Sequence, residues 1–191
     1  MLVVSDASPL RYLILVESAD VLPKMFGRVV APPEVITELS QPKTPEAVRT
    51  WISARPAWLE VQGPAETMEA KGLGLGERQA ISLAQEIRAE AVLLDDRDAV
   101  KEARSRGLMV LGTLALLDEA ASRGLIGDLH GTLERLLKET NFRRNPTTDG
   151  IMRAMLRREF DRRHSHQQDQ AAPTHEQSPD LKQNGGFKPG M

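Results

Sequence analysis

The 191-residue chain contains no cysteine, only 4% aromatic residues and no long hydrophobic run. The absence of cysteine excludes disulfide bonds, thiolate metal sites, iron–sulfur clusters and a cysteine nucleophile. A membrane-spanning helix needs about 20 mostly apolar residues, and no such stretch is present. The N-terminal segment has an aspartate at position 6 and no basic region, so it does not resemble a signal peptide. We therefore expect a cytoplasmic protein without membrane association.

The formal net charge of −2 is distributed unevenly along the chain. Residues 1–140 contain 16 basic and 21 acidic residues, whereas residues 141–163 contain seven arginines and three acids. An acidic body joined to an arginine-rich segment is compatible with a metal-dependent enzyme that acts on a polyanion, and equally with a solvated terminal helix. The last 28 residues include only five apolar ones. We therefore predict one domain over residues 1–160 and a disordered polar tail over residues 161–191.

Short apolar segments alternate with stretches that have helical spacing. The segments at 2–4, 29–31, 91–94 and 108–111 are predicted strands, and residues 58–61 are a predicted edge strand. Ser8 is the expected cap of the first helix, with Pro9 in its first turn. Strands that are apolar on both sides and separated by helices predict an α/β fold with a parallel sheet covered on both faces. The other predicted helices span about 34–39, 45–54, 77–88, 98–106, 113–123, 128–140 and 147–160.

Acidic residues follow the predicted strands at several points. Asp6 ends the first strand, and the adjacent Asp95 and Asp96 end the strand at 91–94. Glu38 lies on the helix after the second strand, and Glu77 begins a helix after a glycine-rich loop. The carboxyl ends of parallel strands and the starts of the following helices share one edge of the sheet. We therefore expect these acids to converge at that edge.

A cluster of carboxylates costs free energy at neutral pH unless cations neutralise it. The available ligands are hard oxygen atoms, with no cysteine and with His130 as the one histidine of the body, and this donor set favours Mg²⁺ or Mn²⁺. Each acid also has an ordinary structural interpretation, as a helix cap, a helix-start acid or a solvated helix residue. Their common placement favours a metal site.

Other kinds of site lack support in the sequence. The glycine-rich loop at residues 72–76 is not followed by the lysine and hydroxyl residues of a P-loop. No G-x-S-x-G nucleophile elbow is present. A phosphoacceptor receiver domain also gathers acids at strand ends, but it expects a lysine after a late strand. This chain has Gly112 and Thr113 there.

An ordered set of motifs resembles a known family. SDASPLRYL is followed by LPKMFGRVVAPPEVITEL, GLGLGERQAISLA, AVLLDDRDA and LMVLGTLALL. Over residues 3–158 the set resembles the PIN-domain proteins, in particular a VapC-like branch. The resemblance implies a three-layer α/β/α fold with a central parallel sheet. It also implies a Mg²⁺- or Mn²⁺-dependent ribonuclease, often the toxin of a toxin–antitoxin pair.

The resemblance also assigns roles to the acids of the predicted cluster. Ser8 is implied as a supporting hydroxyl, and a one-residue shift leaves open which of the two adjacent aspartates is the metal ligand. Relatives often carry an arginine shortly after this acidic pair, where the chain has Val100. The implied catalytic residues are Asp6, Glu38, Glu77, Asp95 and Asp96, of which all but Glu38 are implied as metal ligands.

The implied reaction is hydrolysis of an RNA phosphodiester bond by a metal-activated water. The implied partners are the RNA substrate and a cognate antitoxin protein, with a homodimer left open. The rival interpretation is a PIN-fold module that keeps the acids and acts only through protein contacts. Acids gathered at one point favour the nuclease, and scattered acids favour the module. The arginines considered for RNA or partner contact, with solvent exposure as the alternative, are Arg143, Arg144, Arg153, Arg157 and Arg158.

Overall fold

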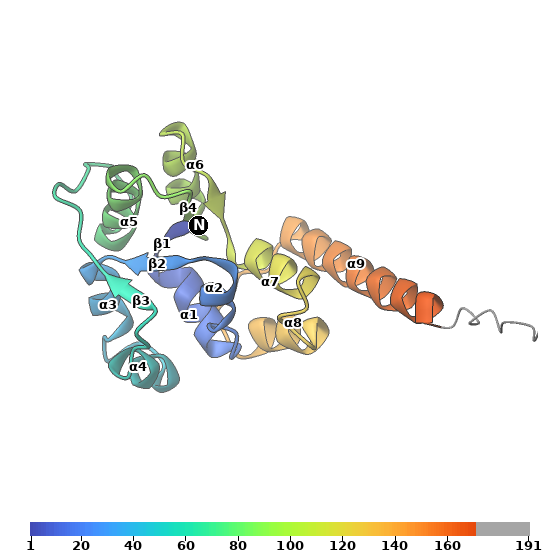
Figure 1. Ribbon diagram of the computed structural model, residues 1–191. Helices are drawn as coiled ribbons and strands as arrows, with labels where there is room; N and C mark the ends of the chain where they lie inside the picture. Colours follow the sequence, from blue (N-terminus) through green and yellow to red (C-terminus); the bar gives the residue numbers. More distant parts are fainter. Residues whose placement is uncertain (171–191) are drawn as a thin grey trace, which may run out of the picture.

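The centre of the molecule is a five-stranded sheet in which every pair of neighbouring strands is parallel (Figure 1). The computed structural model describes residues 1–170, the last five of them by their helical backbone alone. The strand order is β3-β2-β1-β4-β5, so β1 lies in the middle. The strands are β1 (Leu2–Ser5), β2 (Arg28–Ala31), β3 (Leu59–Val61), β4 (Ala91–Leu93) and β5 (Val110–Leu111).

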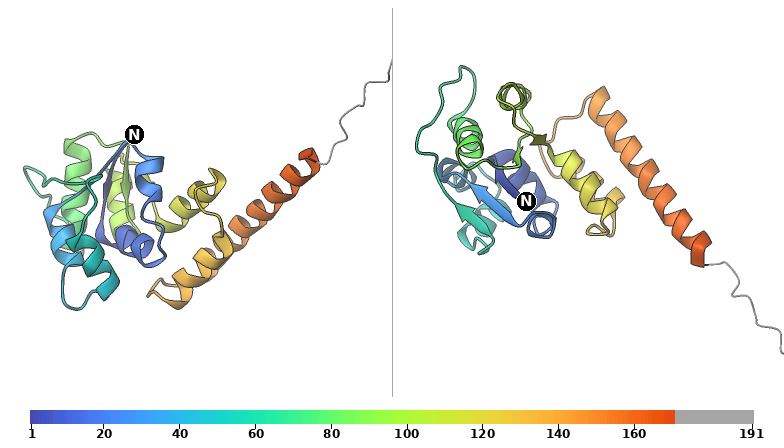
Figure 2. Two further views of the ribbon diagram at one scale, coloured as in Figure 1. Left: turned by 60° about the horizontal axis from the view of Figure 1, so that its bottom comes forward. Right: turned by 45° about the horizontal axis from the view of Figure 1, so that its top comes forward.

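Helices cover both faces of this sheet, which confirms the predicted three-layer α/β/α fold (Figures 1 and 2). Helices α5 and α6 pack on one face, and α1, α4, α7 and α8 belong to the layer on the other. The helices are α1 (Ala7–Leu15), α2 (Val21–Met25), α3 (Pro33–Leu39), α4 (Glu46–Ser53), α5 (Leu75–Glu86), α6 (Arg97–Ser105), α7 (Thr113–Ser122), α8 (Leu129–Lys138) and α9 (Pro146–Gln170).

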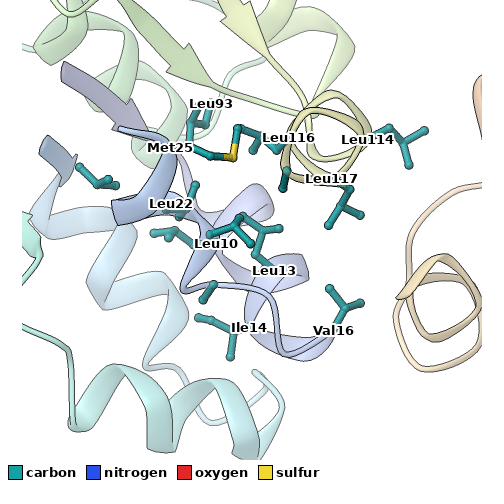
Figure 3. Packing of buried hydrophobic residues seen from close by; sticks show 14 of the residues in the cluster. Leu10, Leu13, Ile14, Val16, Leu22, Met25, Leu93, Leu114, Leu116 and Leu117 are labelled. Carbon is teal, nitrogen blue, oxygen red and sulfur yellow. The ribbon is translucent and has the colours of Figure 1, made fainter. Parts of the chain in front are cut away.

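Alternation along the strands divides the buried residues between two cores. Val3 faces the core formed with α1, α7 and α8, and Val4 faces the core formed with α5 and α6. Both valines are fully buried, as expected for a β-branched residue in a central parallel strand. Figure 3 shows the larger core, in which Leu10 and Leu13 of α1 lie near Leu116 of α7. The central position of β1 fixes the residue that follows it, Asp6, between two neighbouring strands.

The C-terminal helix is longer than the sequence pattern predicts. Helix α9 continues to Gln170, so residues 161–170 are helical and do not belong to a disordered tail. Met152 and Met155 are buried, and α9 lies beside α7 and α8 and extends away from the sheet (Figure 2). Ion pairs between Glu159 and the arginines three and four positions later support the helix beyond residue 160. The predicted tail over residues 171–191 lies outside the described residues.

The other elements agree with the predicted ones within a few residues, with one exception. Helix α2 was not predicted, because it has only five residues and contains Pro23. No helix in the described part of the chain is long and apolar enough to cross a membrane.

Candidate active site

Asp6 lies at the carboxyl end of the central strand and begins α1. Its backbone N–H donates to the carbonyl oxygen of Leu93 at 3.1 Å, which ties it to β4. Its Oδ2 accepts from the backbone N–H of Ser8 at 3.4 Å, so Asp6 is the N-cap of α1. The prediction that Ser8 caps this helix was therefore wrong: Ser8 lies within the first turn, and its N–H is a donor to the cap.

The carboxyl group of Asp6 is buried in a way that capping does not explain. The residue is 4% exposed, and its Oδ1 is buried without a hydrogen-bond partner. The pKa of Asp6 is raised from the ordinary 3.8 to about 7. Burial is the main cause, the charges of Glu77 and Glu38 add to the rise, and the N–H groups of Ala7 and Ser8 oppose it. A buried acceptor without a partner costs free energy, so Oδ1 is suited to accept a ligand.

Gly76, the second residue of α5, brings two of the predicted acids together. A Cβ atom at this position would lie 3.2 Å from Oε2 of Glu38 and 3.5 Å from Oδ1 of Asp6. The carboxylates of Asp6, which follows β1, and of Glu38 on α3 therefore both lie close to the backbone of α5, at a position where a side chain would crowd them. From the sequence, Gly76 is recognised as part of a glycine-rich loop, but its position next to the carboxylates of Asp6 and Glu38 is not predicted.

Glu77 follows directly and extends the acidic cluster. Its Oε2 accepts from the backbone N–H of Gly74 at 2.8 Å, across the first turn of α5. Burial raises the pKa of Glu77, the Gly74 N–H lowers it, and the charges of Asp96, Glu38 and Asp98 raise it. Glu77 therefore accepts a hydrogen bond at the start of its helix, as expected for a helix-start acid, and it also interacts electrostatically with the other acids.

The structure distinguishes the two adjacent aspartates after β4. Both carboxylate oxygens of Asp95 are bonded to Thr113, with Oδ1 accepting from its N–H at 2.8 Å and Oδ2 from its hydroxyl at 2.6 Å. Asp95 therefore joins β4 to the start of α7. Asp96 uses Oδ1 to accept from the N–H groups of Asp98 and Ala99, at 2.8 and 3.1 Å. Asp96 is exposed, and its charge raises the pKa of Glu77. Of the two aspartates, we therefore assign Asp96 to the acidic cluster.

We expect Asp96→Asn to reduce mainly activity and Asp95→Asn to reduce mainly stability. Asparagine caps helices about as well as aspartate, so Asp96→Asn should leave the melting temperature nearly unchanged and lower any metal-dependent activity at least tenfold. Asp95→Asn should lower the free energy of unfolding by about 1–2 kcal/mol, because it weakens a charge-assisted bond to Thr113, and should change activity only a few-fold. Thermal melts and initial rates of both variants test this; the reverse pattern would return Asp95 to the site.

The donor set fits a hard divalent cation only in part. Carboxylate oxygens are the ligands that Mg²⁺ and Mn²⁺ prefer, and the unpaired, buried Oδ1 of Asp6 and an oxygen of Glu38 both lie close to Gly76. Among the described side chains, those of residues 1–165, however, no three His, Asp or Glu residues are gathered closely enough to hold one ion together. Glu77 and Asp96 each have one oxygen engaged by a backbone N–H. Asp6 and Glu38 each have an oxygen beside the same glycine, and both are candidate ligands.

Two basic pockets adjoin the acids, and neither was predicted. One, of about 140 Å³, is lined by Glu38 together with Arg11 and Lys43. The other, of about 360 Å³, lies beside Asp95 and is lined by three basic side chains of α6. The basic residues of this second pocket are Arg97, Lys101 and Arg104. Their spacing along a helix is a signal that could have been found, and they surround Val100, the position where relatives often carry an arginine.

The arginines considered near the C-terminus differ in their surroundings. Arg144 pairs with Asp149 at 2.9 Å, and Arg158 pairs with Asp118 at 2.5 Å. Burial and the charge of Asp95 raise the pKa of Tyr12. The charges of Arg11 and Arg143 oppose this rise. Arg153 and Arg157 are exposed on α9. Two of the five arginines are thus engaged in ion pairs, whereas Arg153 and Arg157 are exposed to solvent.

Comparison with known proteins identifies the family of the chain. A sequence model described as a PIN domain matches residues 2–157. The chain belongs to the PIN-domain family. Among solved structures, this PIN domain is similar to a PilT N-terminus domain protein from the hyperthermophilic archaeon Sulfolobus solfataricus P2. The two share 14% sequence identity with a TM-score of 0.43, over 75% of this chain and 100% of the other. A search of curated proteins found no significant match.

Proposed function

We propose that this PIN domain is a Mg²⁺- or Mn²⁺-dependent endoribonuclease that hydrolyses phosphodiester bonds of RNA. Family membership supports the proposal, because PIN domains are generally nucleases. The observation that carries it is the presence of basic side chains beside acids: Arg11 and Lys43 line one pocket together with Glu38, and basic side chains of α6 line another beside Asp95. Basic side chains attract a polyanionic strand, and the acids supply a cation site next to it.

The residues divide the work by their position. Asp6 and Glu38 would hold the cation, because an oxygen of each lies within 3.5 Å of one point beside Gly76 and Oδ1 of Asp6 has no partner. Glu77 and Asp96 would complete the site directly or through water. A bound divalent cation polarises the phosphate and lowers the pKa of a bound water. No protein nucleophile is needed, and Asp95 maintains the local backbone through Thr113.

Mg²⁺ should stabilise the fold, and Glu77→Gln should reduce this effect. A cation that binds only the folded protein stabilises it by about 2.7 kcal/mol at one hundred times its dissociation constant. Glutamine can still accept from Gly74, so the variant should melt close to wild type in EDTA. Its Mg²⁺-induced rise in melting temperature should be less than half that of wild type.

Glu46→Gln is the matched control for this melt series. Glu46 begins α4 and is a helix-start acid outside the cluster, so its variant should keep the full Mg²⁺-induced rise. Equal rises in all three proteins would remove Glu77 from the site. No rise in wild type would contradict the cation site itself.

The finer role proposed is that of a toxin in a VapC-like toxin–antitoxin pair. It is supported by the motif resemblance, and it implies a cognate antitoxin protein as partner and leaves a homodimer open. Induced expression of wild type should arrest bacterial growth, whereas equal amounts of Asp6→Asn should not. Growth arrest by both proteins would mean that toxicity does not depend on the acids.

A second candidate function is a non-catalytic protein-interaction module. It is favoured by one observation, the absence of three closely grouped metal-binding side chains over residues 1–165, where the structure describes side chains. Under this alternative the protein neither cleaves RNA nor gains stability from Mg²⁺. The two candidates therefore separate in the same purified protein.

A further inference from the structure

A small pocket adjoins the acidic cluster and shares Glu38 with it. Its volume is about 140 Å³, and its polar lining comes from Ser8, Arg11, Glu38, Lys43 and Thr44. This is well below the roughly 300–1,000 Å³ of pockets that enclose a drug-sized ligand. The pocket therefore has room for a single compact group and not for a nucleoside.

Arg11 is the most informative residue in this pocket. Its Nε is buried and has no hydrogen-bond partner. No ion pair within the described residues involves Arg11 or Lys43, although Glu38 lines the same pocket. A buried guanidinium donor without an acceptor is unfavourable, and its planar fork matches the oxygens of a phosphate. The pocket is thus lined by two cationic side chains that form no ion pair with an acid among the described residues.

The outer wall of the pocket is held in place by its own hydrogen bonds. The hydroxyl of Thr44 donates to the carbonyl oxygen of Glu38 at 3.1 Å, and its N–H donates to the carbonyl oxygen of Gln41 at 2.9 Å. Nε of Arg49 donates to the carbonyl oxygen of Thr44 at 3.1 Å. The segment that carries Lys43 is therefore fixed across from α1, which carries Arg11.

We propose that this pocket binds one backbone phosphate of the RNA, next to the phosphate that is cleaved. The proposal rests on the proposed function, because Glu38 belongs to both the pocket and the cation site. The charges that face the phosphate are those of Arg11 and Lys43, which attract it, and of Glu38, which repels it until a cation neutralises Glu38. Arg11 and Lys43 are thus positioning residues, which fix the register of the strand over Asp6 and Glu38.

Binding of a short single-stranded RNA in EDTA tests the pocket without cleavage. Fluorescence polarisation over a series of salt concentrations should show at least fivefold weaker binding for Arg11→Met at low salt. Each phosphate contact contributes about 0.7 to the slope of log K against log salt for single strands, so the slope should fall by about that amount. Lys43→Met should act in the same direction, and Arg11→Lys should recover part of the loss.

Lys24→Met is the matched control for lost positive charge. Lys24 is exposed on α2, which leads into the start of β2 at the opposite edge of the sheet. This variant should bind RNA like wild type. A second experiment uses a set of RNAs that each carry one neutral methylphosphonate linkage at a different position. For one of these RNAs, wild type and Arg11→Met should bind with the same affinity, because the phosphate that contacts Arg11 has lost its charge. Inorganic phosphate should compete with RNA for wild type and less for Arg11→Met.

The outcomes separate this proposal from the proposed function. Unchanged affinity and slope in both Arg11→Met and Lys43→Met would overturn the phosphate pocket, even if wild type cleaves RNA. If wild type binds RNA through Arg11 but does not cleave it with Mg²⁺, the proposed nuclease function is wrong, and the proposed phosphate pocket still stands. If Arg11→Met has a lowered melting temperature, its weaker binding could reflect a damaged fold. Lys43→Met and the methylphosphonate RNAs then decide whether the pocket binds a phosphate. Competition by inorganic phosphate without any Arg11-dependent RNA binding would contradict RNA as the source of the phosphate.

Discussion

Asp6→Asn should abolish metal-dependent RNA cleavage and at the same time stabilise the metal-free protein. Groups that only orient metal ligands already contribute about 10–100-fold, so loss of the central ligand charge should lower the rate by more than about 100-fold. Asparagine can still accept from the N–H of Ser8 as an N-cap. The buried carboxylate, which has an unpaired oxygen, is replaced by a neutral group.

The stability gain should depend on pH in a defined way. The pKa of Asp6 is raised from 3.8 to about 7, mainly by burial. Between these values the unfolded chain releases a proton that the folded protein keeps, so stability falls as pH rises through this window. The gain from Asp6→Asn should therefore be absent below about pH 4 and complete above about pH 7, with a ceiling of about 4 kcal/mol.

Asp128→Asn is the control for this experiment. Asp128 is also an N-cap, accepting from the N–H of Gly131 at 2.9 Å, but lies exposed at the start of α8. Thermal melts in EDTA at pH 5 and pH 8, with rates in Mg²⁺, should show no comparable effect for it. Asp6→Asn with wild-type rates at saturating Mg²⁺ would remove Asp6 from the catalytic site. A melting temperature that is lower at pH 8 would contradict the buried, raised-pKa carboxyl.

Gly76→Ala should impair the site without harming the fold. The added methyl group would lie 3.2 Å from Oε2 of Glu38 and 3.5 Å from Oδ1 of Asp6, in the space assigned to the cation. Alanine is more favourable than glycine within a helix by up to about 1 kcal/mol, and α5 contains position 76 near its start. We expect an unchanged or higher melting temperature in EDTA, a lost Mg²⁺-induced rise and at least tenfold slower cleavage.

Gly150→Ala provides the comparison for the effect on helix stability. Gly150 is within α9, and no atom lies within 4 Å of a Cβ built there. This variant should gain similar helix stability and keep both Mg²⁺ stabilisation and activity. If Gly76→Ala behaves in the same way, the space between Asp6 and Glu38 is not where the cation binds.

The features that depend on nearest neighbours in sequence could be predicted. Apolar runs such as Val3–Val4 predicted the strands, and the position of Asp6 directly after the first strand placed it at the carboxyl ends of the parallel strands. The family motifs identified the PIN domain, which the match over residues 2–157 confirmed. These predictions succeeded because strand alternation and strand-end placement follow from local periodicity.

The features that the sequence did not reveal come from contacts between distant segments. Thr113 occupies both oxygens of Asp95, 18 residues earlier, and no local pattern distinguishes Asp95 from Asp96. The pocket of Arg11 and Lys43 depends on how α1 meets the segment after α3. The length of α9 was underestimated because a polar composition was taken to mean disorder, although its ion pairs support a helix.

The most direct test of the central claim is an RNA cleavage assay with the purified full-length protein. Wild type and Asp6→Asn are incubated with a mixed-sequence, end-labelled RNA in Mg²⁺, in Mn²⁺ and in EDTA. We predict discrete internal cuts by wild type with either cation, no cuts in EDTA, recovery when Mg²⁺ is restored, and no cuts by Asp6→Asn. Cleavage that persists in EDTA or in Asp6→Asn, or an intact RNA under every condition, would contradict a metal-dependent nuclease centred on Asp6.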